Sequence, residues 1–154
     1  MSAGKPAPEP RVDNRRARFE YEFLEHVEAG LVLTGTEIKS VRTGQISISE
    51  AYARARDGEM WLYGMHIPPY KEGSFSNHEP NRPRKLLLHR TEISRLSKGS
   101  AEKGYTIVPT RLYFKRGRVK IDLALARGKK QWDKRRVTKE REAQREISRA
   151  LRGR

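Results

Sequence analysis

The sequence of 154 residues contains no cysteine, which excludes disulfide bonds, thiolate metal sites and a cysteine nucleophile. No apolar run approaches the roughly 20 residues that a membrane-spanning helix needs. The first residues, "MSAGKPAPEPRVDNRR", lack the apolar segment that a secretory signal requires. These absences predict a soluble protein of a reducing compartment, and we expect it in the cytoplasm.

Patterns that carry catalysis or metal binding are also missing. The sequence has no HExxH, no GxSxG and no glycine-rich phosphate loop. Its four histidines do not stand at metal-ligand spacing; they are His26, His66, His78 and His89. Glu20 and Glu22 form a pair of carboxylates, but on a predicted strand edge, where charged side chains usually face solvent. We therefore expect no enzymatic activity, no cofactor and no metal.

Positive charge is what the sequence has in excess. It holds 34 Lys and Arg residues against 19 Asp and Glu residues, a net charge of +15. Such a surplus disfavours a compact monomer unless a polyanion neutralises it, and nucleic acid is the commonest such partner. An anionic membrane would require a basic amphipathic helix with a broad apolar face or a lipidation signal, and neither is found. The composition therefore favours a nucleic-acid-binding protein.

The chain divides into three parts. Residues 1–13 contain three prolines and little that can be buried, so we expect them to be disordered. Residues 14–128 carry the patterns of a folded body. Within them we expect a strand over residues 18–27, a turn at 28–30, a second strand over 31–35 and a short helix or turn over 36–42.

Two hairpins are predicted in the rest of the body. Residues 51–67 flank an Asp57-Gly58 turn, and residues 105–127 flank an Arg116-Gly117 turn. Pro109 indicates an edge or bulge position. Between the hairpins lie a loop over residues 68–83 and a predicted helix over residues 84–99, with Leu86, Ile93 and Leu96 on one side. The pattern predicts a mainly β fold: an antiparallel barrel like the oligonucleotide-binding (OB) fold, with flanking short helices and a basic C-terminal tail.

The tail, residues 129–154, is strongly basic. From Gly128 to the end, 4 Lys and 7 Arg face 4 acidic residues. Ion pairs at helical spacing contribute only a few tenths of a kcal/mol each, too little to hold an isolated helix. We expect this tail to be disordered when free and helical when bound to a partner. Trp132 lies among the cations and suits stacking on an unpaired base.

Candidate binding residues of the body cluster near the long loop. Arg82, Arg84, Lys85 and Arg90 surround three consecutive leucines, which cannot all face one core. Either the leucines are ordinary core residues, or Leu87 or Leu88 is left at the surface for packing on a nucleobase. Glu37 is likewise open to two interpretations. Its carboxylate forms a salt bridge, or it accepts hydrogen bonds from base amino groups.

The motifs "RKLLLH" and "ALARGKKQWDKR", with the spacing between them, resemble the SmpB family of proteins that bind transfer-messenger RNA (tmRNA). Further segments from Asn14 to the C-terminus occur in the family's order. The resemblance implies an OB barrel that grips the tRNA-like elbow of tmRNA. The complex would enter bacterial ribosomes stalled on broken messages, for trans-translation. The tail would lie as a helix in the empty mRNA path, beginning at the decoding centre. Alanyl-tRNA synthetase and elongation factor Tu are implied as further partners on the same RNA.

The resemblance also implies two sets of site residues. The expected tmRNA contacts are Glu37, Lys85, Leu87, Leu88, His89, Lys120 and Gly128. The expected contacts with the decoding centre and the mRNA channel are Lys129, Lys130, Trp132, Asp133, Lys134, Arg135 and Arg136. The chain departs from the family at Phe19, where many members have a histidine, and at Ser47 and Glu50. The alternatives are another OB-fold ribosomal or translation-factor protein that binds rRNA, and an RNA phosphodiesterase.

Overall fold

The computed structural model describes residues 9–71, 77–129 and 131–152, and for residues 131–137 it describes the backbone alone. The strands are β1 (Val12–Asp13), β2 (Tyr21–Leu31), β3 (Tyr52–Arg56), β4 (Glu59–Tyr63), β5 (Arg84–Leu87), β6 (Thr106–Lys115) and β7 (Arg118–Gly128). The helices are α1 (Arg15–Glu20), α2 (Gly35–Arg42), α3 (Arg90–Lys103) and α4 (Gln131–Arg152).

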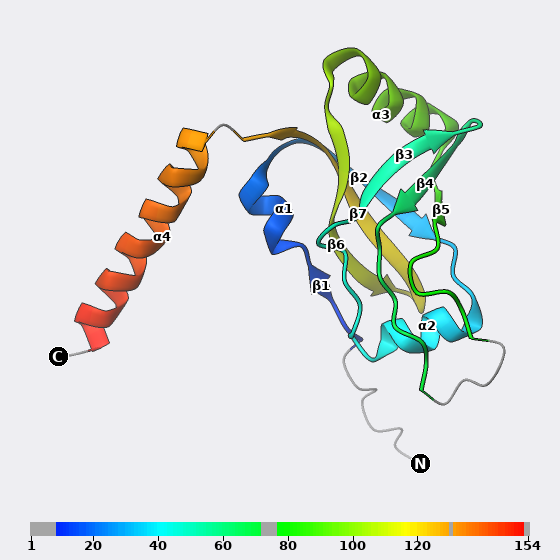
Figure 1. The fold of residues 1–154 in the computed structure, drawn as a ribbon, viewed down its shortest axis with the longest axis horizontal. Coiled ribbons are helices and arrows are strands. Elements are labelled where there is room, and N and C mark those ends of the chain that lie inside the picture. The colour runs from blue at the N-terminus through cyan, green and yellow to red at the C-terminus, as the bar shows by residue number, and fades with distance from the viewer. Residues whose placement is uncertain (1–8, 72–76, 130, 153–154) are drawn as a thin grey trace.

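The strands form one antiparallel sheet in the order β1-β6-β3-β4-β5-β2-β7 (Figure 1). Because β6 also pairs with β7, the sheet closes on itself as a barrel. The predicted fold class, a mainly β antiparallel barrel with short helices at its flanks, is confirmed. Strand order could not be obtained from the sequence, because pairing between distant strands leaves no local pattern.

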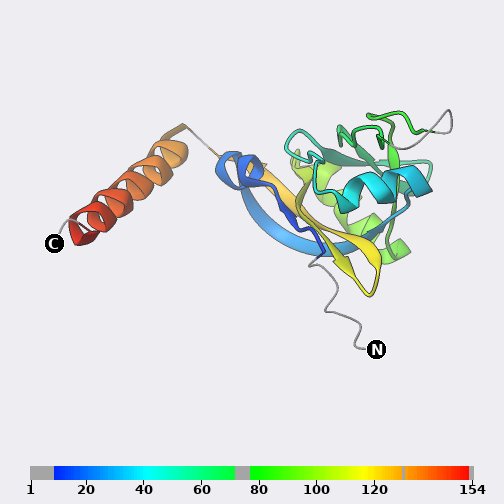
Figure 2. The same cartoon turned by 90° about the horizontal axis from the view of Figure 1, so that it is seen from below.

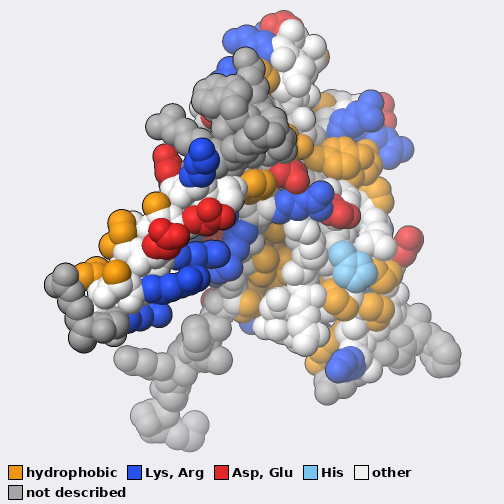
Figure 3. Space-filling model, turned by 60° about the vertical axis from the view of Figure 1, so that its left-hand side comes forward, with side chains coloured by type: hydrophobic (Ala, Val, Ile, Leu, Met, Phe, Trp, Pro, Cys, Tyr) orange, Lys and Arg blue, Asp and Glu red, His pale blue; other side chains and the backbone are white. Residues whose placement is uncertain are grey.

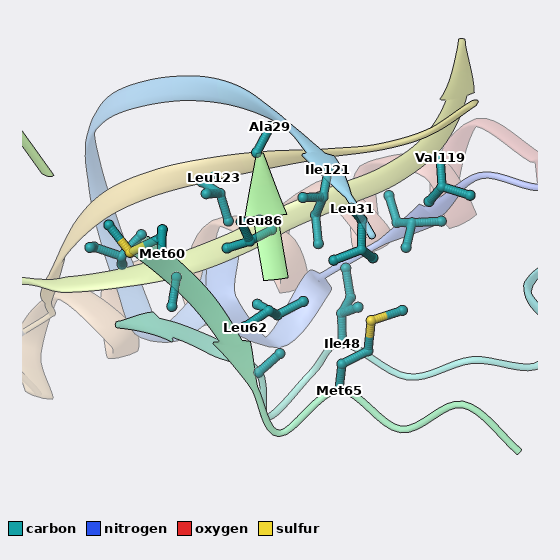
Figure 4. Close-up of a cluster of buried hydrophobic side chains, with 14 of the residues drawn as sticks. Ala29, Leu31, Ile48, Met60, Leu62, Met65, Leu86, Val119, Ile121 and Leu123 are labelled. Carbon is teal, nitrogen blue, oxygen red and sulfur yellow. The ribbon is translucent and has the colours of Figure 1, made fainter. Parts of the chain in front are cut away.

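The barrel interior is filled by apolar side chains that alternate along the strands. Met60 and Leu62 on β4, Leu86 on β5, and Ile121 and Leu123 on β7 are all fully buried (Figure 4). The residues between them point outward, as the two-residue period of a strand requires. Outside the part that α1 covers, where Ala17 packs on Val108 and Ala126, outer residues of the barrel are available for binding.

Both predicted hairpins are confirmed. Asp57 and Gly58 adopt positive φ angles of 51° and 77°, and Arg116 and Gly117 adopt 53° and 75°. Two successive positive φ angles define the type I′ turn, whose twist matches that of the flanking strands. Pro109 lies at a register shift between β6 and β7, which confirms the bulge.

Three element predictions are wrong, and one of them is the second strand over residues 31–35, because β2 ends at Leu31 and α2 begins at Gly35. Residues 84–87 form strand β5 and not the start of a helix, because β4 and β2 lie on either side and pair with it. The helix begins only at Arg90, after His89. Residues 28–30 do not turn; β2 runs unbroken from Tyr21 to Leu31 and pairs with β7 along nearly its whole length. Long-range pairing overrides the local signal in these last two segments.

The two ends of the chain extend the barrel differently. Residues 1–8 lie outside the described residues, so the expected disorder there stays a prediction, while Val12 and Asp13 pair with β6. Helix α4 extends away from the barrel (Figures 1 and 2). Its Arg141 guanidinium lies 5.8 Å from the ring centroid of Phe19 on α1. Among the described residues, no helix has both the length and the apolar character needed to cross a membrane.

Candidate nucleic-acid interface

Gly30 marks a hollow on the outer face of the barrel. It lies opposite Leu87 of β5 on one side and opposite Lys120 of β7 on the other. A Cβ added to Gly30 would lie 3.3 Å from the Leu87 Cβ, closer than most real contacts. The missing side chain therefore leaves a groove across three strands, with the apolar side chain of Leu87 on one side and the cationic side chain of Lys120 on the other. We call it the Gly30 groove.

The Gly30 groove has a volume of about 310 Å³. Its lining is apolar at Val32, Ile38 and Leu87 and cationic at Arg118 and Lys120. Leu87 is 55% exposed and Val32 is 41% exposed, which is unusual for residues of this kind. An apolar floor beside two cations suits a nucleobase or ribose with its phosphates at the rim.

Side chains alternate between the outer face and the core in the segment from Lys85 to His89, as the two-residue period of a strand requires. Lys85 and Leu87 point outward, and the Lys85 Nζ lies 2.9 Å from a Glu59 carboxylate oxygen. The exposed-leucine hypothesis is therefore confirmed at Leu87, whereas Leu88 is half-buried and packs against the core. His89 is exposed, and its backbone N–H donates to the Glu92 carboxylate at 3.0 Å, which starts α3.

Glu37 lies beneath the surface and forms a buried ion pair. Its side chain is 0% exposed. Arg84 Nε donates to one carboxylate oxygen at 2.5 Å, the Thr34 N–H donates to the other at 2.8 Å, and Arg82 donates to both. Of the two interpretations left open by the sequence, the structure shows the salt bridge. In this arrangement the carboxylate has no free edge for a base.

The pKa of Glu37 reflects this enclosure. Burial would raise the pKa, but the hydrogen bonds from Arg82, the Thr34 backbone and Arg84 outweigh burial and lower the pKa to about 2. Burial lowers the pKa of Arg84, and the Glu37 carboxylate opposes that shift. The pair is therefore an ionised unit inside the protein at neutral pH.

Arg84 connects this ion pair to the segment after β4. It donates to the carbonyl oxygens of Met65 at 2.7 Å and Pro80 at 3.0 Å. Glu37 therefore ties the start of α2 to the end of the long loop. The next residue of α2, Ile38, lines the Gly30 groove. Glu37 thus supports one wall of the groove without facing it.

Gly128 and Lys129 lie at the opposite end of β7 from Lys120, roughly 26 Å along the strand. Gly128 is exposed and pairs with Tyr21. The Lys129 N–H donates to the Glu20 carbonyl at 2.8 Å, and its Nζ donates to the Arg18 carbonyl at 3.0 Å. Lys129 thus satisfies carbonyl groups at the end of α1, where a cation is favoured.

The remaining tail candidates lie outside what the structure describes. Lys130 is outside the described residues, and only backbone is described for Trp132, Asp133, Lys134, Arg135 and Arg136. Their expected contacts with the ribosome stay predictions. In the described part of the chain, no group of three or more His, Asp or Glu side chains is placed to hold a metal ion.

Sequence reasoning missed the residue that shapes the groove. The local sequence favours a turn at Gly30, although an isolated glycine in a strand often marks a close approach. The signal was therefore present in the sequence. Val32 and Arg118 also line the groove, but nothing in their local sequence distinguishes them from their neighbours.

Comparisons with known proteins point to one family. The family model described as SmpB protein matches residues 11–153. The chain is 55% identical over 147 residues to the SsrA-binding protein of Desulforudis audaxviator, covering 95% of this chain and 96% of that one. It is 56% identical over 138 residues to the SsrA-binding protein of Acidothermus cellulolyticus, covering 90% and 87%. A solved structure described as "tmRNA-SmpB: a journey to the center of the bacterial ribosome" is similar with a TM-score of 0.67 and 50% identity, covering 79% and 86%.

Proposed function

The chain belongs to the SmpB family, and on that premise we propose that it binds tmRNA and delivers it to stalled bacterial ribosomes for trans-translation. The observation that carries this proposal is the match to SsrA-binding proteins over nearly the whole chain. A structure at 50% identity whose description names tmRNA and the bacterial ribosome supports both partners. The net charge of +15 suits a protein that binds RNA.

Within this function, the body takes the tRNA-like part of tmRNA at the Gly30 groove. Leu87 packs on a base or ribose, and Lys120 and Arg118 neutralise phosphates. Glu37 acts as a positioning residue through Arg82 and Arg84. The exposed side chains of Lys85 and His89 extend the contact at one edge of the groove, and Gly128 contributes at the other end of β7.

The tail probes the decoding centre and the empty mRNA channel. Helix α4 carries acidic and cationic side chains on its surface (Figure 3), and its Ile147 and Leu151 are 54% and 66% exposed. These apolar side chains are left for a partner. A basic helix enters a channel only where another polyanion is absent, so competition with intact mRNA gives selectivity without a catalytic step.

The location of the protein should be that of the ribosomes on which it acts. We place the protein in the cytoplasm, where it works without an enzymatic activity of its own. Alanyl-tRNA synthetase and elongation factor Tu act on the same RNA and are the further partners proposed.

The first prediction compares two neighbouring leucines. Leu87→Ala should weaken tmRNA binding about tenfold, because Leu87 is exposed in the groove, and should change the free energy of unfolding by less than about 1 kcal/mol. Leu86→Ala, the matched control, should cost about 2–5 kcal/mol of stability because Leu86 is fully buried. Gel-shift titration and urea unfolding measure the two quantities. Unchanged tmRNA affinity in Leu87→Ala would show that the Gly30 groove is not part of the tmRNA interface.

The same gel-shift assay separates the rRNA alternative. At raised salt the protein should retain tmRNA and release generic rRNA fragments, because sequence-blind phosphate contacts weaken steeply with salt. Equal retention of both RNAs would favour an rRNA-anchoring protein.

A further inference from the structure

A second set of outward residues lies on the hairpin β3–β4, on strands that do not form the Gly30 groove. Tyr52 and Arg54 of β3 lie opposite Tyr63 and Trp61 of β4. Opposed residues of an antiparallel pair share one face. Between them, Ala53 and Leu62 are buried in the barrel. The hairpin therefore presents three aromatic rings and a guanidinium together on its outer face.

The aromatic rings are ordered and open to solvent. The Tyr52 and Tyr63 rings stack with centroids 5.6 Å apart and an interplanar angle of 19°. Tyr52 is 43% exposed, and Trp61 and Tyr63 are partly exposed. The stacking holds the two phenols in place before any partner arrives, so little conformational entropy is lost when a flat ligand binds.

Basic residues flank Trp61, one of the three rings. In the ladder Trp61 lies between Arg54 of β3 and Lys85 of β5. Lys85 has a carboxylate partner in Glu59, whereas Arg54 is exposed and forms no ion pair within the described part of the chain. A free guanidinium beside exposed rings is complementary to a phosphate next to a base.

From this juxtaposition we propose that the outer face of β3–β4, formed by Tyr52, Arg54, Trp61 and Tyr63, is a second RNA-binding surface that stacks unpaired bases of a single strand. The bases must be unpaired, because a duplex hides the faces that stack on aromatic side chains. The ring-bearing face of an OB-like barrel is suited to this ligand. The inference goes beyond the proposed function, since tmRNA binding in the Gly30 groove does not require it.

Trp61 supplies the reporter for a test. The chain has two tryptophans, so Trp132→Phe leaves Trp61 as the one indole. Single-stranded oligoadenylate should quench its fluorescence at low salt, and the stacked base should protect the ring from an added soluble quencher. Absence of any effect on Trp61 fluorescence up to millimolar oligonucleotide would overturn the proposal.

Variants in the Trp132→Phe background distinguish stacking from general electrostatics. Tyr52→Leu, which keeps apolar bulk and removes the ring, should weaken oligoadenylate binding about tenfold, and Tyr52→Phe should restore it. Arg54→Ala should weaken it several-fold. Lys98→Ala, an equal loss of charge at an exposed site on α3, should not. Equal effects of Arg54→Ala and Lys98→Ala, with none from Tyr52→Leu, would reduce the contact to non-specific attraction and contradict the proposal.

The tmRNA affinity of each variant is measured in parallel. Tyr52→Leu should leave most of it intact if the Gly30 groove carries that binding. If the Trp132→Phe parent binds tmRNA with full affinity but does not bind oligoadenylate, the second surface is contradicted and the proposed function stands. The tmRNA affinity of Leu87→Ala tests only the Gly30 groove. Urea unfolding of each variant confirms that the barrel is intact.

Discussion

At the scale of single residues, Glu37 organises the surroundings of the groove. A carboxylate with no exposed surface is retained because two guanidiniums and a backbone N–H satisfy it. Removing one partner leaves the others buried and unpaired, which costs more than the pair contributes. Glu37 should therefore affect RNA binding indirectly, because it holds α2 and the loop before β5 in position.

The Glu37→Gln variant tests this role. It should lower the free energy of unfolding by about 3–5 kcal/mol, because Arg84 stays buried without its charge partner. It should also weaken tmRNA binding, although a negative charge is removed from a protein that binds a polyanion. Glu59→Gln is the matched control, since it breaks a partly exposed pair worth less than about 1 kcal/mol. Tighter tmRNA binding by Glu37→Gln would show that net charge decides.

Glu37 also predicts how stability depends on pH. Its pKa is about 2 in the folded protein against 4.5 for the free group. A lowered pKa stabilises the fold above about pH 4.5, and this contribution, about 3 kcal/mol, is lost as pH falls from 4.5 toward 2. Urea unfolding across this range should show a steeper loss of stability in the native protein than in Glu37→Gln. Parallel pH profiles of the two proteins would contradict the lowered pKa.

Residue types alone left Glu37 undecided. The sequence shows an acid in a basic protein, but its two partners are 45 and 47 residues away. The exposed leucine was predictable, because a run of three leucines exceeds what one face of an element can bury. Which leucine is exposed followed only from the strand period of β5.

At the scale of elements, turn chemistry fixes the hairpin β3–β4. Gly58 in its turn and Gly64 after β4 share a φ of 77°. They differ in their surroundings. A Cβ at Gly58 meets nothing within 4 Å, whereas a Cβ at Gly64 would lie 2.7 Å from the Glu50 backbone oxygen. Substitutions at the two glycines therefore distinguish the free-energy cost of a positive φ from the additional cost of a steric clash.

Gly64→Ala should therefore destabilise the barrel more than Gly58→Ala. The positive φ costs roughly 1 kcal/mol at either site. At Gly64 the backbone around Glu50 must also shift, so the total should exceed about 2 kcal/mol. Denaturant unfolding of the two variants measures the difference. Equal losses would mean that the chain near Glu50 moves aside without cost.

The elements predicted from sequence are those with local signals. Asp57-Gly58 and Arg116-Gly117 specify their turns. The pattern of residues 36–42 favours a short helix or a turn, and the structure has helix α2 there. The errors fall where pairing is distant. β5 has four residues and little strand pattern of its own, and it exists because β2 and β4 lie beside it.

At the scale of the whole molecule, a closed barrel carries an extended basic helix. The pairing of β2, β6 and β7 holds the barrel together, and Lys129 fixes the point at which the tail leaves it. The strand order and the direction of α4 had no signature in the sequence, whereas the succession of short strands and turns predicted the barrel. The boundary between body and tail is visible in the sequence as a change of composition at Gly128. The division of function between the two parts stays a prediction.

Truncation after Lys129 tests the central claim, that the body holds tmRNA and the tail detects the empty channel. This end point keeps the Lys129 contacts with α1. Tagging of the incomplete peptide on stalled ribosomes should be abolished. Binding of tmRNA at raised salt should stay within about fivefold of the full chain, because non-specific phosphate contacts of the tail are then weak. A parallel fall in tmRNA affinity and in tagging would contradict this division of labour.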